Sequence, residues 1–318
     1  MRTYLDCLPC FVAQALSAGR VVAVDEKTQM QILQFVLPLL ARTDLRMPPP
    51  TMGQKIHQLV RQLTKNSNPY HPIKVGSNRR SLDAYPHFKA AVDNAADPLK
   101  TAVGYAIAAN TFDYCANASS SGPEFVRVIE NSLPAEIDIS EIEEFRAALK
   151  DAERILYIGD QAGEIVFDRL LIEQMPVEKV TFVVKGGPVG NKATIADARM
   201  VGLTDIVEVT DDGYDAPGTM PASSSWDFRE RFDAADLIVA KGHENYESLN
   251  GVSKDIFFLM HIRCSRLADA SECREGTSVL LRSGRLGRRV MKTEIPEIDQ
   301  EWWTKIHAEG VMDGSRWL

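Results

Sequence analysis

Two patterns of hydrophobic positions divide the chain near residue 150. Before that point, apolar residues recur every three to four positions, which predicts amphipathic helices. After it, short apolar runs alternate with helical segments, and the runs predict strands at residues 155–158, 180–184, 206–209, 237–240, 257–262 and 279–281. We therefore predict a helical domain at residues 1–150 and an α/β domain, with a C-terminal tail, at residues 151–318.

The spacing of the predicted strands suits βαβ units. Each unit joins two parallel strands through a helix, so we expect a mostly parallel sheet with helices on both faces. A segment rich in Gly, Pro and Ser at 211–226 predicts a mobile loop beyond a strand end, which is either a lid or a surface insertion. The amphipathic tail at 296–317 carries three of the four tryptophans, and we expect it to cover the core or an oligomer interface.

Capping and proline signals set helix boundaries in the first half. Thr51 follows three prolines and is predicted to cap the next helix. A helix at 73–85 is predicted to end before Pro86, because proline cannot continue helical hydrogen bonding. Ser140 is predicted to cap a helix at 141–149 that leads into the second domain.

A carboxylate lies where the first predicted strand of the α/β domain ends. Gly159 closes the apolar run and Asp160 follows it, just before a helical pattern. Asp160 is either an ordinary helix N-cap or part of a ligand site, because ligands of open α/β sheets bind at the carboxyl ends of strands. Lys185 and Lys241 follow two further strands. Since parallel strands place these ends on one edge of the sheet, the convergence favours the ligand site.

Oxygen ligands and lysines are predicted to meet at this edge. Asp160, Gln161 and Asp197 offer the hard oxygen atoms that suit Mg²⁺ or Mn²⁺ and also hold other divalent metals. Lys185 and Lys241 add positive charge. A divalent cation, lysines and helix N-termini together describe a phosphate-binding site.

Hydrolysis is the chemistry that such a site favours. A metal that lowers the pKa of a bound water makes the site hydrolytic, and Glu164, one helical turn from Asp160, is placed to orient or deprotonate that water. Asp160 is the alternative nucleophile, through an aspartyl phosphate. The sequence has no G-x-x-x-x-G-K-[ST] and no G-x-G-x-x-G after a strand, which argues against P-loop ATP use and a nicotinamide enzyme.

Composition narrows the class of protein. Hydrophobic residues make up 45% of the 318 residues and charged residues 25%, as expected for a globular protein with a substantial core. The net charge of −8 argues against nucleic-acid binding, which depends on Lys and Arg. No apolar run is long enough to span a membrane, and the N-terminus lacks a secretory pattern, so we expect a cytoplasmic protein.

The five cysteines are odd in number and scattered, which argues against a disulfide framework. Cys7 and Cys10 form a C-x-x-C pair. The pair is either redox-active or half of a metal site, or simply two half-buried thiols on a first helix.

Several short motifs occur in order along nearly the whole chain. They are C-x-x-C at 7–10, Asn-Pro-Tyr at 68–70, Ala-Ala-Asn-Thr-Phe-Asp at 108–113, Gly-Asp-Gln-Ala-Gly-Glu at 159–164, Asn-Lys-Ala-Thr-Ile-Ala-Asp-Ala at 191–198 and Lys-Gly-His-Glu-Asn-Tyr-Glu at 241–247. In this order and spacing the sequence resembles the DUF89 family, the metal-dependent damage-control phosphatases. Within it, the sequence resembles the prokaryotic branch with an N-terminal C-x-x-C.

The resemblance implies a fold and a metal site. The fold is a three-layer α/β/α sandwich with a Rossmann-like, mostly parallel sheet and an N-terminal helical domain. The implied ligands of the divalent metal (Mg, Mn, Co or Ni) are Asp160, Gln161 and Asp197. Gln161 departs from the family, which usually has Asn there, and Ala109 replaces a family glycine.

The resemblance also implies further site residues. Asn191, Lys241 and Asn245 are expected to contact phosphate or substrate. Asn110 and Asp113, which lie on one helical face and by themselves suit an ordinary solvated surface, are expected to face the same cleft. Cys264 lies where the prokaryotic branch often has cysteine, and with Cys7 and Cys10 it is expected to form a second cluster, structural or redox.

These observations favour a metal-dependent phosphatase acting on a small phosphorylated metabolite. The alternative is a protein that binds a metal or a phosphorylated metabolite without turnover, and the Gln161 departure keeps this alternative open. Methyl transfer to a carboxylate ranks last, because the sequence has no Gly-rich strand-to-helix turn for a methyl donor. The sequence leaves the substrate, the metal and the oligomeric state open.

Overall fold

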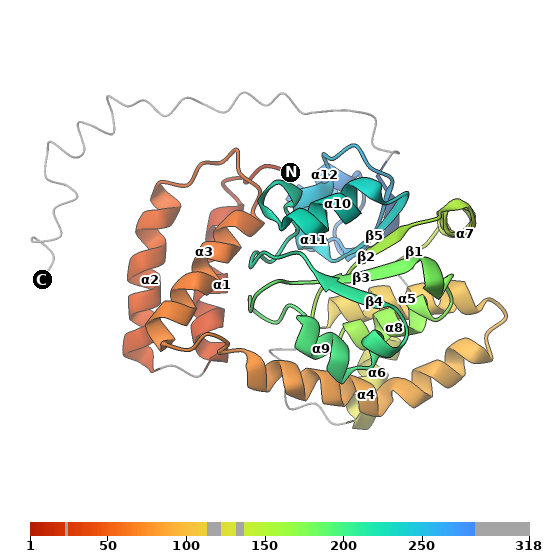
Figure 1. The fold of residues 1–318 in the computed structure, drawn as a ribbon. Coiled ribbons are helices and arrows are strands. Elements are labelled where there is room, and N and C mark those ends of the chain that lie inside the picture. Colours follow the sequence, from red (N-terminus) through yellow and green to blue (C-terminus); the bar gives the residue numbers. More distant parts are fainter. Residues whose placement is uncertain (23–24, 113–121, 132–136, 284–318) are drawn as a thin grey trace, which may run out of the picture. The chain divides into compact units, whose positions relative to one another are not determined.

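Seven strands form one sheet in the computed structural model of the protein, which describes residues 1–22, 25–112, 122–131 and 137–283 (Figure 1). The strands are β1 (Ile137–Asp138), β2 (Ile155–Ile158), β3 (Val180–Val184), β4 (Glu208–Asp211), β5 (Leu237–Lys241), β6 (Ile256–His261) and β7 (Ser278–Arg282). Their order across the sheet is β1-β7-β6-β5-β2-β3-β4. The strands β2 to β6 are parallel to one another, whereas β7 is antiparallel to β6 and β1 is parallel to β7.

The strand order reverses between β2 and β5. From β2 the chain moves outward through β3 to β4, and it then returns to β5 on the other side of β2. In open α/β sheets such a reversal opens a crevice at the carboxyl ends of the two strands, where ligands bind. Asp160 follows β2 and Gly242 follows β5, so both residues lie at this point.

Helices cover both faces of the sheet, as predicted (Figure 1). Alternate strand residues face opposite layers: Tyr157 and Phe182 pack into one core, and Ile158 and Phe258 into the other. Packed on the first core are α4 (His71–Asp93), α5 (Pro98–Thr111), α6 (Gly122–Asn131), α7 (Ile142–Asp151), α8 (Ile165–Ile172) and α9 (Ile195–Met200). The second core is covered by α10 (Trp226–Ala234), α11 (His243–Leu249) and α12 (Ser265–Ser271). The three-layer α/β/α prediction is confirmed.

The first three helices have a hydrophobic core of their own. They are α1 (Cys7–Val21), α2 (Glu26–Ala41) and α3 (Pro50–Thr64), and they bury Phe11, Ile32 and Ile56 against one another. The later helices α4, α5 and α7 instead share the sheet's first core. The division at residue 150 stays a prediction. Among the described residues, no helix is long and apolar enough to cross a membrane.

The predicted helix end at Pro86 is wrong. Helix α4 continues through Pro86 to Asp93. Proline inside a helix costs about 3 kcal/mol, but Phe88 beyond it is fully buried and packs on Phe167 and Tyr105, with ring centroids 5.1 and 4.8 Å away. This packing outweighs the local preference, because burying a phenylalanine contributes about 1.5–3 kcal/mol and the continued helix carries further buried residues.

Two predicted caps and one strand boundary are also corrected. Neither Thr51 nor Ser140 caps a helix: α3 begins at Pro50, a favoured first-turn residue, and α7 follows Glu141. Strand β4 begins two residues later than predicted. The backbone N–H groups of residues 206 and 207 donate to the Leu203 carbonyl in a 3₁₀ turn, each at 3.1 Å, and are therefore unavailable to the sheet.

The segment 211–226 is a packed part of the fold and not a tolerated surface insertion. Asp212, Ala216 and Thr219 are fully buried. Asp215 forms an ion pair with Arg61 of α3 and accepts a hydrogen bond from Gln58 at 3.2 Å. The segment thus ties α3 to the carboxyl edge of the sheet. The predicted tail at 296–317 lies outside the described residues.

Candidate functional site

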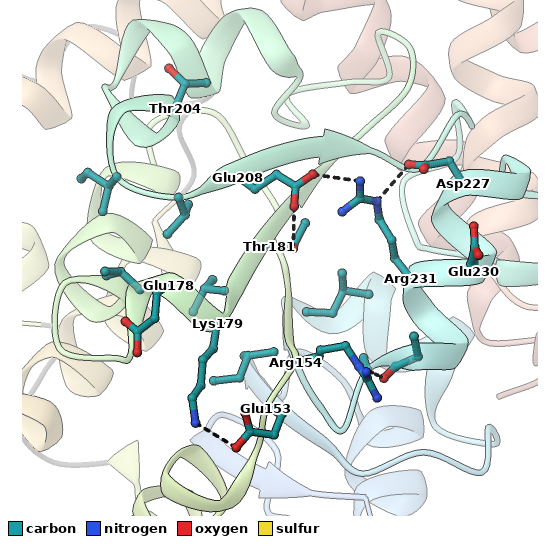
Figure 2. Close-up of a pocket in the computed structure, with 18 of the residues that line it drawn as sticks. Glu153, Arg154, Glu178, Lys179, Thr181, Thr204, Glu208, Asp227, Glu230 and Arg231 are labelled. Carbon is teal, nitrogen blue, oxygen red and sulfur yellow. Dashed lines mark hydrogen bonds and ion pairs between the residues drawn. The ribbon is translucent and has the colours of Figure 1, made fainter.

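A pocket lies at the amino ends of the strands, at the edge of the sheet opposite to the predicted site (Figure 2). It lies beside the first residues of β2 and β3. Two ion pairs lie along its lining: Lys179 is 3.5 Å from Glu153, and Arg231 is 2.8 Å from Glu208. The predicted site residues lie instead at the carboxyl ends.

Asp160 lies directly against the backbone of Gly242. A Cβ atom at Gly242 would come within 2.2 Å of the Asp160 Oδ2 atom, and Gly242 has a φ of +82°, in the region that only glycine adopts easily. Asp160 is 2% exposed. Helix α8 starts at Ile165 after Glu164, so the interpretation of Asp160 as its N-cap is wrong.

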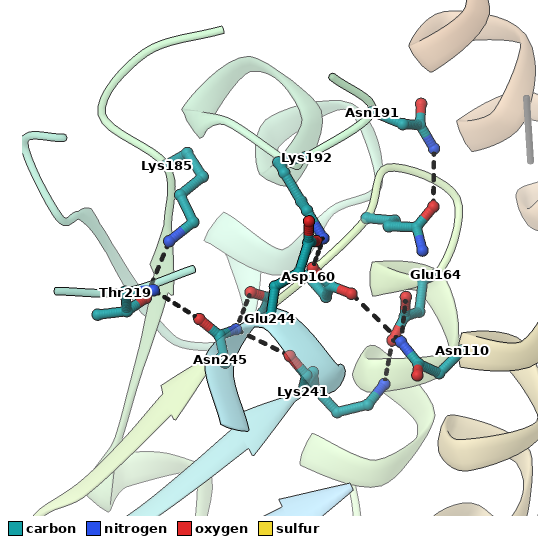
Figure 3. Close-up of polar contacts among 12 residues, drawn as sticks. Asn110, Asp160, Glu164, Lys185, Asn191, Lys192, Thr219, Lys241, Glu244 and Asn245 are labelled. Atoms are coloured by element: carbon teal, nitrogen blue, oxygen red, sulfur yellow. Dashed lines mark hydrogen bonds and ion pairs between the residues drawn. The ribbon is translucent and has the colours of Figure 1, made fainter. Parts of the chain in front are cut away.

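The loops that follow β2 and β3 are joined by backbone hydrogen bonds. The N–H of Ala162 donates to the Asn191 carbonyl at 2.8 Å, and the N–H of Ala193 donates to the Asp160 carbonyl at 2.9 Å. This pairing brings Asn191 beside Gln161, whose Oε1 accepts a long hydrogen bond of 3.5 Å from the Asn191 amide (Figure 3). The buried Oδ1 of Asn191 has no hydrogen-bond donor within the part of the chain that the structure describes.

Lys192 joins two carboxylates at the centre of the site (Figure 3). Its ammonium contacts Asp160 Oδ1 and Glu244 Oε2, the latter on α11. Burial opposes the charge, but Asp160 and Glu244 more than offset it and raise the pKa of Lys192. Burial would likewise raise the pKa of Glu244, and Lys192 with His243 and Arg263 lowers it to about 2. Lys192 and Glu244 are therefore charged near neutral pH.

Sequence reasoning missed Lys192 and Glu244. Both lie inside motifs that were singled out: Lys192 follows Asn191 in the motif at 191–198, and Glu244 lies in the motif at 241–247. Lys192 follows Asn191, a predicted phosphate contact, so its position in the sequence could have indicated a site residue. The contact with Glu244 had no sequence signal, because it depends on how two loops meet.

Asn110 reaches the same centre from α5. Its amide donates to Asp160 Oδ2 at 3.2 Å and to Glu164 Oε1 at 3.1 Å, and the residue is fully buried. The interpretation of a solvated face is therefore wrong for Asn110. Asp113 lies outside the described residues.

Lys241 lies beneath this centre and not at its surface. Its ammonium contacts Glu164 at 2.7 Å and Asp168 at 2.5 Å, and it donates to the Ala106 carbonyl at 2.9 Å. These contacts use its three N–H donors, and its side chain is fully buried. Burial raises the pKa of Glu164 to about 7, although Lys241 acts in the other direction. Glu164 is thus a buried carboxyl group that exchanges a proton near neutral pH.

The other predicted phosphate contacts hold the 211–226 segment in place. Lys185 contacts Asp212 at 2.9 Å and donates to the Thr219 hydroxyl at 2.9 Å. Asn245 accepts from the Thr219 N–H at 2.9 Å and donates to the Lys241 carbonyl at 2.8 Å. Thr219, which sequence reasoning missed, therefore connects both residues.

Asp197 is held by residues of α4. It lies 2.6 Å from the Lys74 ammonium and accepts a hydrogen bond of 2.9 Å from Asn78. It also accepts from the N–H of Thr194 at the start of α9, at 2.9 Å. Asn78 in turn accepts from the Gly163 N–H at 2.7 Å, which links Asp197 to the loop after Asp160.

The predicted metal ligands do not fit a divalent ion as they are arranged. Asp160 is paired with Lys192, Gln161 lies against Asn191, and Asp197 is paired with Lys74. Within the described ranges, no group of three or more His, Cys, Asp or Glu side chains is arranged to hold a metal ion. The ligand set stays a prediction.

The predicted cysteine cluster also stays a prediction. The chain before α1 and the start of α12 lie together, because Arg266 pairs with Asp6 at 2.7 Å. Burial raises the pKa of Cys7 and the Tyr4 backbone N–H opposes that rise, whereas Glu247, Cys264 and Cys10 add to it. Among the described cysteines, Cys7, Cys10, Cys264 and Cys273 are free thiols.

His57 of α3 is a buried histidine beside the loop after β3. Its Nδ1 lies 2.7 Å from the Tyr70 hydroxyl, and its ring lies 3.2 Å from where a Cβ of Gly190 would stand. Burial lowers the pKa of His57 to about 4. The imidazole is therefore neutral in the folded protein at neutral pH.

Acidification should destabilise the protein through His57. Between pH 6.5 and 4 the unfolded chain binds a proton at this histidine and the folded protein does not, so stability falls as the pH falls. By pH 4.5 the loss is about 2–3 kcal/mol. The free energy of unfolding is measured with urea at pH 7.5 and 4.5 for the parent protein and for His57→Gln. We expect the decrease between these pH values to be about 2–3 kcal/mol larger in the parent. Parallel curves would contradict the buried neutral state.

Comparison with known proteins assigns the chain to a family. The model of the damage-control phosphatase ARMT1-like domain matches residues 3–279. A damage-control phosphatase of Archaeoglobus fulgidus is 31% identical over 82% of this chain and 92% of its own length. An uncharacterized protein of Methanocaldococcus jannaschii is 30% identical over 87% of this chain and 94% of its own.

A solved structure supports the same assignment. The crystal structure of a DUF89 family protein from Pyrococcus horikoshii superimposes with a TM-score of 0.79 at 27% identity, covering 89% of this chain and 99% of that one. Fold, motif order and matched length therefore agree: the chain belongs to the family of the damage-control phosphatase ARMT1-like domain.

Proposed function

We propose that the protein is a phosphatase that hydrolyses a small phosphorylated metabolite at the site around Asp160. Two of its relatives are named damage-control phosphatases. The observation that carries the proposal is the junction made by Asn110, which holds Asp160 and the buried carboxyl group of Glu164 together at the switch point of the sheet. A carboxyl group that titrates near neutral pH is suited to carry a proton during hydrolysis.

Each group of the site has a task in this proposal. The phosphoryl group enters beside Lys192, whose positive charge attracts its oxygens. Either a water forms the new bond to phosphorus while the bond to the leaving oxygen breaks, or Asp160 does so and a water then cleaves the aspartyl phosphate to release phosphate. Glu164 takes the proton of the attacking water and returns one to the leaving oxygen. Lys241 and Asn110 fix the position of Glu164.

The divalent metal that the family resemblance implies is tested separately from these steps. Mg²⁺, Mn²⁺, Co²⁺ or Ni²⁺ would polarise a phosphoryl oxygen if bound. Since the predicted ligands are paired with protein groups, the roles of Lys192, Asp160 and Glu164 do not depend on a metal. Comparing phosphate release with each metal and with a chelator shows whether the reaction needs a divalent metal.

Phosphate release is the test of the proposed function. We expect the full chain to release phosphate from at least one member of a panel of sugar and cofactor phosphates. We expect Asp160→Asn to lower the rate at least about 100-fold, because the amide no longer holds the Lys192 ammonium by charge and misplaced groups cost about that much. Asp44→Asn, at an exposed aspartate paired with Arg46, is the matched control and should keep the parent rate.

Two outcomes would count against the phosphatase. One is release that Asp160→Asn leaves unchanged. The other is binding of a phosphorylated metabolite, measured by calorimetry, without release under any metal condition. The second outcome would favour the alternative of a non-catalytic binding protein, whose ligand stays at the site without turnover.

A further inference from the structure

We propose that Lys192 is the resident cation of this site, occupying with its ammonium the position between Asp160 and Glu244 where a divalent metal would otherwise neutralise the two carboxylates. The inference rests on the proposed function only for the identity of the site. It concerns which positive charge neutralises Asp160, and its main test is a binding measurement.

The first support is the position of the ammonium. It contacts one carboxylate oxygen of Asp160, in the loop after β2, and one of Glu244 on α11, so it lies between two separate parts of the crevice. The side chains of Lys192, Asp160 and Glu244 are 9, 2 and 15% exposed. Carboxylates removed from water to this degree need a compensating positive charge, and Lys192 supplies it.

The second support is the fixed backbone of Lys192. Its N–H donates to the Val189 carbonyl at 3.0 Å, and the residue pairs with Gln161 across the two loops. The start of the side chain is therefore anchored beside Asp160. The ammonium therefore reaches the two carboxylates from a backbone that is held in place by hydrogen bonds.

The third support comes from comparing the lysines at the strand ends. Lys241 is engaged by Glu164, Asp168 and a carbonyl, and Lys185 by Asp212 and Thr219. Among the described residues, Lys192 is the lysine whose ammonium contacts Asp160. Lys192 is therefore the lysine that compensates the Asp160 carboxylate.

A consequence follows for metal binding. An ion that takes Asp160 as a ligand must displace the Lys192 ammonium or share the carboxylate with it, and like charges at such distances repel. Removing the ammonium would leave the Asp160 and Glu244 carboxylates facing one another without the positive charge that lies between them. Two oxygen-donor carboxylates in that arrangement suit Mn²⁺.

Calorimetric titration of the full chain with Mn²⁺ tests the inference. We expect the parent to bind Mn²⁺ weakly, with a Kd above about 0.1 mM, and Lys192→Met to bind at least about tenfold more tightly. Lys192→Arg keeps the charge and should bind as weakly as the parent. Lys192→Met combined with Glu244→Gln should lose the gain. Lys89→Met, at a partly exposed lysine of α4, is the matched control.

The outcomes separate this inference from the proposed function. Binding by the parent below about 0.1 mM, or equal binding by the parent and Lys192→Met, overturns the role of Lys192. The parent titration decides the matter even if Lys192→Met fails to fold. Absence of phosphate release in all variants counts against the phosphatase and leaves the calorimetric comparison valid.

Discussion

Replacing Lys241 with methionine is expected to lower the free energy of unfolding by about 3–5 kcal/mol, or to prevent folding. Removing one partner of a buried ion pair has a cost of this order, because the remaining charge has no compensation. Here the ammonium faces two carboxylates, Glu164 and Asp168, and all three side chains are fully buried. Methionine keeps the length of the side chain but supplies no positive charge.

The pKa shifts around Lys241 support the same expectation of a large loss of stability. Burial acts to lower the pKa of Lys241, and Asp168 with Glu164 raises it instead. Burial raises the pKa of Asp168 as well, and Lys241 opposes that rise. Without Lys241, both carboxyl groups would take up protons or water would enter the core.

Urea unfolding of Lys241→Met measures the effect, with Lys89→Met as the control for loss of a lysine at a partly exposed site. The control should stay within about 0.5 kcal/mol of the parent. A triple variant that adds Glu164→Gln and Asp168→Asn should recover part of the loss, because it removes the unpaired charges. A loss below about 1 kcal/mol in Lys241→Met would show that the charges are solvated.

The sheet was predictable because its local signals agree with its tertiary role. Buried parallel strands need continuous apolar runs, so residues 155–158 and 180–184 were assigned with their observed bounds. The signal weakens where local chemistry and packing disagree. Pro86 is a helix breaker by itself, yet it lies inside α4. The short strand β1 is two residues long and has no periodicity to detect.

The site was predictable only in part, for a related reason. Parallel strands bring their carboxyl ends together whatever the loops do, so Asp160 and the polar ends of β3 and β5 were found. Their pairings depend on how loops meet. The Lys192–Glu244 contact and the bond between Thr219 and Asn245 join residues far apart in sequence, and no local pattern predicts them.

Gly242→Ala is expected to disable the site while leaving a folded protein. The turn after β5 passes directly under Asp160, and an alanine Cβ would stand 2.2 Å from its Oδ2 and 3.2 Å from the Asn110 amide nitrogen. The carboxylate must therefore move, and a displacement of about 1 Å at reacting groups costs about 100-fold in rate. The φ of +82° adds about 1–3 kcal/mol of backbone strain.

Two readouts separate the effects of Gly242→Ala. Phosphate release should fall at least about 100-fold. The free energy of unfolding should fall only by the backbone strain of about 1–3 kcal/mol. Gly76→Ala is the matched control, because a Cβ at Gly76 in α4 meets no atom within 4 Å, and it should keep the parent rate with equal or greater stability. If Gly242→Ala releases phosphate as fast as Gly76→Ala does, the position of the Asp160 carboxylate does not control the reaction.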